Sequence, residues 1–194
     1  MNVSLRRYYK SFGSLYAFVA GIPFLLPLLN LYQSHATEYL YPPLGDAQSL
    51  FFGLTFALML MTTFAVYVSC RAARRIHPLV PFLLILAFTI GAGCVMALDI
   101  RCVRVVDVPT KNLEVPLSIG FDRSDFALST YPNWTDYAML QDRGPVEEKI
   151  KELWTMKSIW EARFLLWAAY SVTLSLLLAV ACVGVYQFAG CNLG

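Results

Sequence analysis

Four long runs of the chain contain no charged side chain, and they dominate its hydrophobic pattern. They cover residues 12–32, 48–70, 79–98 and 164–190. Each has at least the roughly 20 residues that a helix rising 1.5 Å per residue needs to cross a hydrocarbon core of about 30 Å. The pattern therefore predicts four transmembrane helices. The first run also fits a secretory signal peptide cleaved after Ala36, although its length favours a retained span.

The only long polar segment, residues 99–162, lies between the third and fourth runs and holds most of the charged residues. Residues 100–108 and 113–121 are rich in β-branched side chains, so one or two short strands are expected. A turn is expected around 131–133. Residues 145–162 predict an amphipathic helix that opens with Pro145 and carries Glu147 and Glu148 in its first turn. Because no proline separates this helix from the fourth apolar run, a second interpretation is one continuous helix through the two.

These elements define the expected fold class and its parts. We expect an all-α membrane protein with four transmembrane helices and a small mixed extramembrane domain between helices three and four. Its parts are a three-span region over 1–98, a polar domain over 99–162, and the fourth span with the C-terminus over 163–194.

Composition supports a membrane protein and argues against several functions. The chain is 58% hydrophobic and 14% charged, with a mean hydropathy of +0.56. A soluble domain is roughly 45–50% apolar and about 25% charged. The net charge of +2 is too small to indicate direct nucleic-acid binding. The five cysteines lack metal-binding spacing, so neither a metal nor another cofactor is expected.

The distribution of Lys and Arg predicts the orientation. Residues 1–11 and 71–77 each carry three basic residues, and the connection 33–47 carries none. Cytoplasmic connections are the ones enriched in Lys and Arg. Both termini and 71–77 are therefore expected in the cytoplasm, with the polar segment outside. Trp160 and Trp167 would then lie near the outer membrane interface, where aromatic residues collect.

The charged residues of the polar segment are the candidates for chemistry. Asp122, Arg123 and Asp125 form one cluster in the sequence, and a second one contains Asp136, Asp142 and Arg143. A catalytic carboxylate pair needs two acids in one cleft, with the pKa of one raised. Solvated charges with local ion pairs are the simpler interpretation, because no nucleophile and base motif accompanies them. We therefore expect no enzyme. The uncharged spans likewise argue against a proton-coupled transporter.

Two surfaces are candidates for assembly. Small residues at four-residue spacing let membrane helices approach closely, either between copies in a homo-oligomer or within one bundle. They are Gly13, Ala17 and Gly21 in the first run, Ala87 and Gly91 in the third, and Ser171, Ser175 and Ala179 in the fourth. The second surface, the basic strip, suits anionic lipid headgroups or an acidic soluble partner. It comprises Arg6, Arg7, Lys10, Arg71, Arg74 and Arg75.

The four uncharged runs, the arginines 71, 74 and 75, and the segment 99–162 together resemble the KwaA family, the membrane subunits of bacterial Kiwa anti-phage systems. The resemblance covers the layout of the whole chain and no diagnostic motif. It implies an oligomeric sensor or scaffold in the bacterial inner membrane that recruits a soluble DNA-binding partner, KwaB, when phage attack the envelope.

The alternative is an oligomeric channel or pore subunit. Its polar path would be lined by polar side chains of the spans, although each of them could equally well form a hydrogen bond with a neighbouring helix. They are Asn30, Thr62, Thr63, Thr89 and Gln187.

Overall fold

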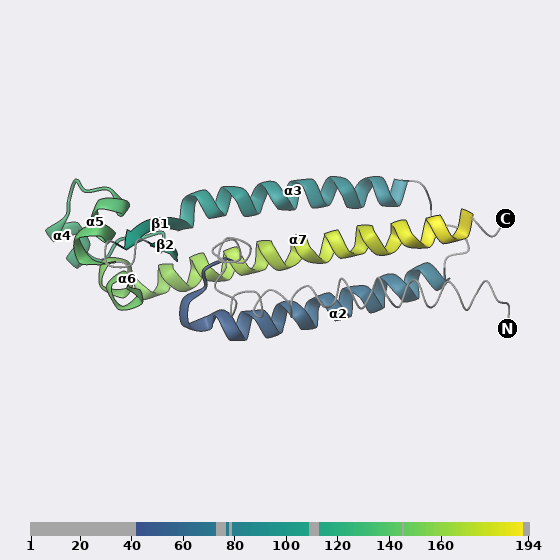
Figure 1. The fold of residues 1–194 in the computed structure, drawn as a ribbon, viewed down its shortest axis with the longest axis horizontal. Coiled ribbons are helices and arrows are strands. Elements are labelled where there is room, and N and C mark those ends of the chain that lie inside the picture. The colour runs from purple at the N-terminus through teal and green to yellow at the C-terminus, as the bar shows by residue number, and fades with distance from the viewer. Residues whose placement is uncertain (1–41, 73–76, 78, 109–112, 145, 192–194) are drawn as a thin grey trace. The chain divides into compact units, whose positions relative to one another are not determined.

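The structure, a computed structural model, describes residues 42–72, 77, 79–108, 113–144 and 146–191. Within them the chain is mainly helical, with one pair of short strands (Figure 1). The first predicted span, 12–32, lies outside the described residues.

Three long helices account for the other predicted spans. They are α2 (Gln48–Ala72), α3 (Leu79–Cys102) and α7 (Met156–Cys191), with 25, 24 and 36 residues. All three are long and apolar enough to cross a membrane, which confirms three of the predicted spans as membrane-length helices and identifies a membrane protein. The 3-10 turn η2 (Gly45–Ala47) leads into α2.

The chain divides into two compact units. The apolar unit contains the described residues of 52–93 and 170–191, and the polar unit contains those of 42–51 and 94–169. In the apolar unit, Met59 of α2 packs with Leu178 and Cys182 of α7. The hydroxyl oxygens of Thr55 and Ser171 lie 2.8 Å apart in a buried hydrogen bond between the same two helices.

The polar unit contains the predicted strands as one antiparallel pair. Strand β1 (Val103–Val108) pairs with β2 (Leu113–Ser118), with Val103 opposite Ser118. The first strand begins later than the sequence indicated, because α3 continues through Cys102. The Arg104 guanidinium donates to the carbonyls of Ile100 and Val103, at 2.7 and 2.9 Å. Basic side chains near the C-terminus of a helix often donate hydrogen bonds to its last carbonyl groups, which have no partner within the helix.

The predicted amphipathic helix over 145–162 is wrong as a single element. Helix α6 (Glu147–Leu153) ends where Trp154 adopts an extended conformation and forms a β-bridge with Arg123. The Thr155 N–H donates to the Asp122 carbonyl at 3.1 Å instead of continuing α6. A new helix, α7, then starts at Met156 and runs on through the fourth apolar run, so only its first turns belong to the predicted stretch. Glu147 and Glu148 do occupy the first turn of α6, as expected.

Two further short helices flank the predicted turn near 131–133. They are α4 (Asp125–Thr130) and α5 (Asp136–Arg143). Each begins with a hydroxyl cap: Ser124 accepts from the Ala127 N–H at 3.1 Å, and Thr135 accepts from the Ala138 N–H at 3.2 Å. Such caps satisfy N–H groups that a helix start otherwise leaves unpaired.

Every regular element of the polar unit from β1 to α7 surrounds or contributes to one hydrophobic core. Trp154 is its largest member and is 1% exposed. Gly120 lies so close to the start of α7 that an added Cβ would overlap the Ser158 hydroxyl and come within 3.1 Å of the Trp154 Cβ. The buried members are Val106, Ile119, Ala127, Tyr131, Met139, Leu140, Ile150, Leu153, Trp154 and Ile159.

Candidate functional site: charged clusters of the polar unit

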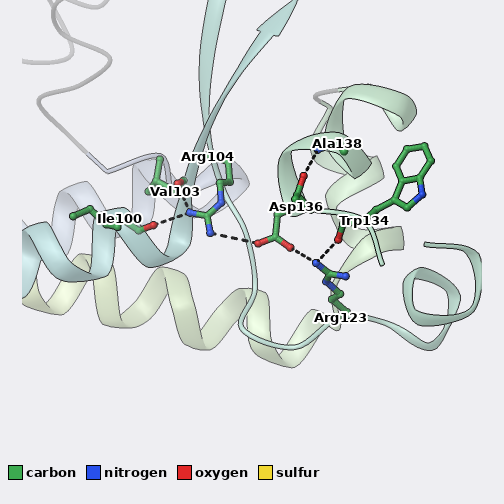
Figure 2. Close-up of polar contacts among 8 residues, drawn as sticks. Ile100, Val103, Arg104, Arg123, Trp134, Asp136 and Ala138 are labelled. Carbon is green, nitrogen blue, oxygen red and sulfur yellow. Dashed lines mark hydrogen bonds and ion pairs between the residues drawn. The ribbon is translucent and has the colours of Figure 1, made fainter. Parts of the chain in front are cut away.

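Asp136, the first residue of α5, lies between two arginines (Figure 2). Its Oδ1 is 2.9 Å from Arg123 Nη2, and its Oδ2 is 3.4 Å from Arg104 Nη2. Arg123 Nη2 also donates to the carbonyl of Trp134 at 2.9 Å. The structure thus joins members of the two acidic clusters that the sequence kept apart, and it adds Arg104, which sequence reasoning did not select.

This Arg–Asp–Arg cluster ties three segments of the chain together. Arg104 comes from β1, Arg123 from the loop before α4, and Asp136 from α5. Each carboxylate oxygen of Asp136 faces a guanidinium, and all three side chains are about one quarter to one third exposed. Charge-assisted pairs of this kind are stronger than hydrogen bonds between neutral groups. The geometry is that of the local ion pairs expected from the simpler interpretation of these charges.

Two further charges of these clusters, Asp142 and Arg143, also have partners within the polar unit. Asp142 Oδ2 accepts a hydrogen bond from the Tyr131 hydroxyl at 2.6 Å. That bond, together with burial, raises the pKa of Tyr131 above its ordinary value. The Arg143 guanidinium lies 4.6 Å from the ring centroid of Phe126, a cation–π distance. Asp125 lies in the first turn of α4, where the helix dipole favours an acid.

Arg163 is the most deeply buried charge that the structure describes, and sequence reasoning did not identify it. It is 3% exposed, near the start of α7. Its Nη1 and Nη2 lie 2.7 and 2.8 Å from the two carboxylate oxygens of Glu147, and its Nε donates to Ser118 Oγ at 2.9 Å. This two-pronged pair binds α6 and β2 to α7. Its only sequence signal is that Arg163 is the last charge before a long apolar run.

A second ion pair lies beside the first. Lys151 Nζ is 2.9 Å from Asp46 Oδ2 and 3.9 Å from Glu147 Oε1. The hydrogen bond to Asp46 raises the pKa of Lys151 above its ordinary value. Gly45, next to Asp46, has φ +57°, and a Cβ there would lie 2.6 Å from Arg163 Nη1. The segment before α2 is thus held against the α6–α7 region by charge and by close approach.

The basic strip is almost entirely outside the described residues. Arg71 lies in the last turn of α2, which ends at Ala72. The other members, Arg6, Arg7, Lys10, Arg74 and Arg75, fall on segments that the structure does not describe.

One of the predicted small-residue faces is covered by the chain's own residues. Ser171, Ser175 and Ala179 are 1%, 8% and 4% exposed, so the chain itself covers them. Gly91 approaches α7 so closely that a Cβ would lie 2.7 Å from Thr173 Oγ1. This placement matches the intramolecular alternative that the sequence left open. The first-run face, Gly13, Ala17 and Gly21, lies outside the described residues.

The threonines considered for a pore lining bond within their own helices. The hydroxyls of Thr62, Thr63 and Thr89 donate to carbonyls four residues earlier, at 2.9, 2.8 and 2.9 Å. Such bonds satisfy a hydroxyl in lipid without any neighbouring helix or water path. Asn30 lies outside the described residues.

The clusters described above are ion pairs and hydrogen bonds that connect separate segments of the polar unit. No protein-family model, curated protein or solved structure matches this chain.

Proposed function

We propose that this chain is a non-enzymatic, four-span sensor or scaffold subunit of a bacterial inner membrane. In this proposal the polar unit faces outward, and both termini and the basic strip face the cytoplasm. The basic strip recruits a soluble protein partner, KwaB-like if the family resemblance holds. Nucleic acid is contacted only through that partner, and the subunit acts as a homo-oligomer.

The observation that carries the proposal is a polar unit with its own core, built directly onto membrane-length helices. Strand β1 follows α3 without an intervening residue, and only Trp154 and Thr155 separate α6 from α7. The Ile119 N–H donates to the Cys102 carbonyl at 2.7 Å, which fixes the junction of α3 with the strand pair. A ligand that rearranges the polar unit would therefore act on the ends of two spans.

The arginines around position 71 support the recruiting role. Each basic residue near an anionic surface contributes about 1 kcal/mol of attraction. The connection 71–77 carries three arginines and residues 1–11 carry three more basic residues, with no acid in either segment, and such charge would attract an acidic partner.

The test is co-purification of the full chain, in mild detergent, with the soluble protein encoded by the neighbouring gene. We expect recovery with the unaltered chain and loss with the triple variant Arg71→Glu, Arg74→Glu, Arg75→Glu. Glu148→Lys, a charge reversal of an exposed residue in the polar unit, is the control and should retain the partner. Failure of the unaltered chain to retain any soluble partner in several detergents would contradict the scaffold.

Topology must be measured on the same variants, because arginines also determine orientation. Reporter fusions at residues 74 and 130 should fall in opposite compartments in the unaltered chain. If they report the same compartment, the proposed division between an outer and an inner face is wrong. Native mass spectrometry of the purified complex measures the oligomer, and a strictly monomeric chain would contradict that part of the proposal.

A further inference from the structure

The first turns of α7 present two different faces within the polar unit. Ile159, Ala162 and Leu166 are buried, at 1%, 0% and 1% exposure, and face the rest of the unit. On another face Met156, Trp160 and Phe164 are spaced four residues apart and are 49%, 47% and 52% exposed. We call these last three residues the interfacial strip. A large apolar strip at helical spacing is unusual on a water-facing surface.

The interfacial strip is held by an aromatic group at the start of α2. Trp160 lies edge-on to Phe51, with ring centroids 6.4 Å apart, and Trp167 stacks on the same ring at 5.1 Å. The indole N–H of Trp167 donates to the Phe51 carbonyl at 2.9 Å. Phe51 is 6% exposed, so the group is packed on its inner side while Trp160 and Phe164 remain half exposed.

The strip is continuous with the apolar surface of α7. After Arg163 the helix carries no charged residue, and exposed apolar side chains continue at Leu165, Val172 and Leu177. If the hydrocarbon core begins at Phe164, 20 residues reach residue 183. Trp160 then lies about 6 Å beyond the core, within a headgroup layer about 5–7 Å thick on each side.

We propose that the interfacial strip seats the polar unit on the membrane surface, with Phe164 at the edge of the hydrocarbon core, Trp160 in the headgroup layer and Met156 just outside that layer. Indole and phenyl rings are favoured at this level because they combine an apolar body with a polar or polarisable edge. Lys157, 87% exposed beside the strip and 3.8 Å from Glu161, supplies an ammonium group for lipid phosphate. This inference requires only that α7 spans the membrane, and it does not depend on the proposed function.

The chain contains a matched control. Trp134, in the turn before α5, is 45% exposed, against 47% for Trp160. Its neighbours in the sequence are Asn133 and Thr135, and its ring packs 5.0 Å from that of Tyr131, not against a membrane-length helix. Trp134 and Trp160 are nearly equally exposed in the protein alone. In a bilayer, Trp160 should contact lipid and Trp134 should remain in water.

The experiment uses tryptophan fluorescence of the full chain in phosphatidylcholine–phosphatidylglycerol vesicles, with brominated lipid and acrylamide as quenchers. Trp160→Phe should remove a component that lipid bromines quench, and Trp134→Phe should remove a component that acrylamide quenches. Phenylalanine preserves a ring against Phe51, and Trp160→Tyr provides a second variant if folding is affected. A Trp160 component that acrylamide quenches as strongly as the Trp134 component, without quenching by lipid, would overturn the proposal.

A protein partner or a second copy on the strip predicts a different result. In that case the Trp160 component would be shielded from both quenchers, and dilution of the protein with excess lipid would expose it. Either finding would overturn the lipid assignment. Protection that is independent of the protein-to-lipid ratio, together with bromine quenching, would support it.

Discussion

Arg163 shows how one residue can organise its surroundings in a chain that is mostly apolar. Both Nη atoms of its guanidinium pair with the Glu147 carboxylate, and its Nε donates to the Ser118 hydroxyl, so the buried positive charge has a counter-charge. A buried ion pair adds little stability compared with a well-packed apolar pair. Removal of one partner, however, leaves the other charge buried and unpaired, which is strongly destabilising. The residue therefore fixes how α6 and β2 meet α7.

Glu147→Gln should destabilise the polar unit by about 3 kcal/mol, because Arg163 would remain buried without a counter-charge. The double variant Glu147→Met, Arg163→Met should recover much of that loss, because it removes both charges and retains volume. Denaturant unfolding of the full chain in detergent, followed by tryptophan fluorescence, measures both. A double variant less stable than the single one would contradict this explanation.

The matched control is the exposed pair Lys157–Glu161, 3.8 Å apart. Lys157→Met should change the free energy of unfolding in detergent by less than about 0.5 kcal/mol, because exposed pairs at this spacing contribute little.

Gly45→Ala should destabilise the polar unit by about 1–2 kcal/mol, because a left-handed backbone disfavours Cβ. The Cβ would also meet the Arg163 guanidinium at 2.6–2.8 Å, and that group cannot move without breaking its pair with Glu147. Gly53→Ala, within α2 and with nothing within 4 Å of the new Cβ, should be neutral or slightly stabilising. Equal effects of the two substitutions on the unfolding midpoint would contradict the steric argument.

The Lys149–Glu152 pair predicts a pH effect. A 2.7 Å hydrogen bond from Lys149 lowers the pKa of Glu152 below its ordinary value of 4.5. A carboxyl whose pKa is lower in the folded state stabilises that state above its unfolded pKa, and the contribution disappears as pH falls through the folded pKa. Glu152→Gln should therefore lower the melting temperature slightly at pH 7, and its effect should shrink progressively as the pH falls below 4.5. If the difference in melting temperature between Glu152→Gln and the unaltered chain grew as the pH fell, the prediction would be wrong.

At the scale of elements, the sequence predicted the long helices far better than the short ones. A run of about 20 uncharged, apolar residues is typical of a membrane-length helix. Helices α2, α3 and α7 contain the predicted runs 48–70, 79–98 and 164–190. Helices α4 and α5 have 6 and 8 residues, too few to display a hydrophobic period. Their hydroxyl caps, Ser124 and Thr135, were the only readable signal.

Ser124→Ala should cost about 1–2 kcal/mol, near the upper limit for a helix cap. Its hydroxyl accepts from the Ala127 N–H and also donates to the Glu152 carbonyl, so it joins α4 to α6. Thr135→Ala loses only the Ala138 N–H contact and should cost about 0.5–1 kcal/mol. Urea titrations of both variants give the comparison, and a larger effect at Thr135 would show that the α4–α6 link is unimportant.

The break at Trp154 could not be predicted from local sequence. Residues 145–162 satisfy helical spacing throughout, but Trp154 instead pairs its backbone with Arg123 and buries its ring in the core. Tertiary contacts thus outweighed helix propensity at this position, as they commonly do.

For the molecule as a whole, the sequence established where the chain is apolar but not how its charges pair. Arg163 is separated from its partners by 16 and 45 residues, and Arg104 from Asp136 by 32. Nothing in spacing or composition links such positions before the chain is folded. The membrane helices follow from solvent preference alone, and the candidate site depends on three-dimensional contacts.

The distribution of the polar unit's core along the chain has a consequence for biosynthesis. Its buried residues begin at Val106, but four of the ten, Ile150, Leu153, Trp154 and Ile159, lie just before or within the start of α7. Until the ribosome has made the start of α7, the earlier strands and helices have an incomplete core and expose apolar surface. Synthesis of α7 and closure of the polar unit are therefore nearly simultaneous, and a chain truncated before residue 150 would be a ready substrate for quality-control proteases.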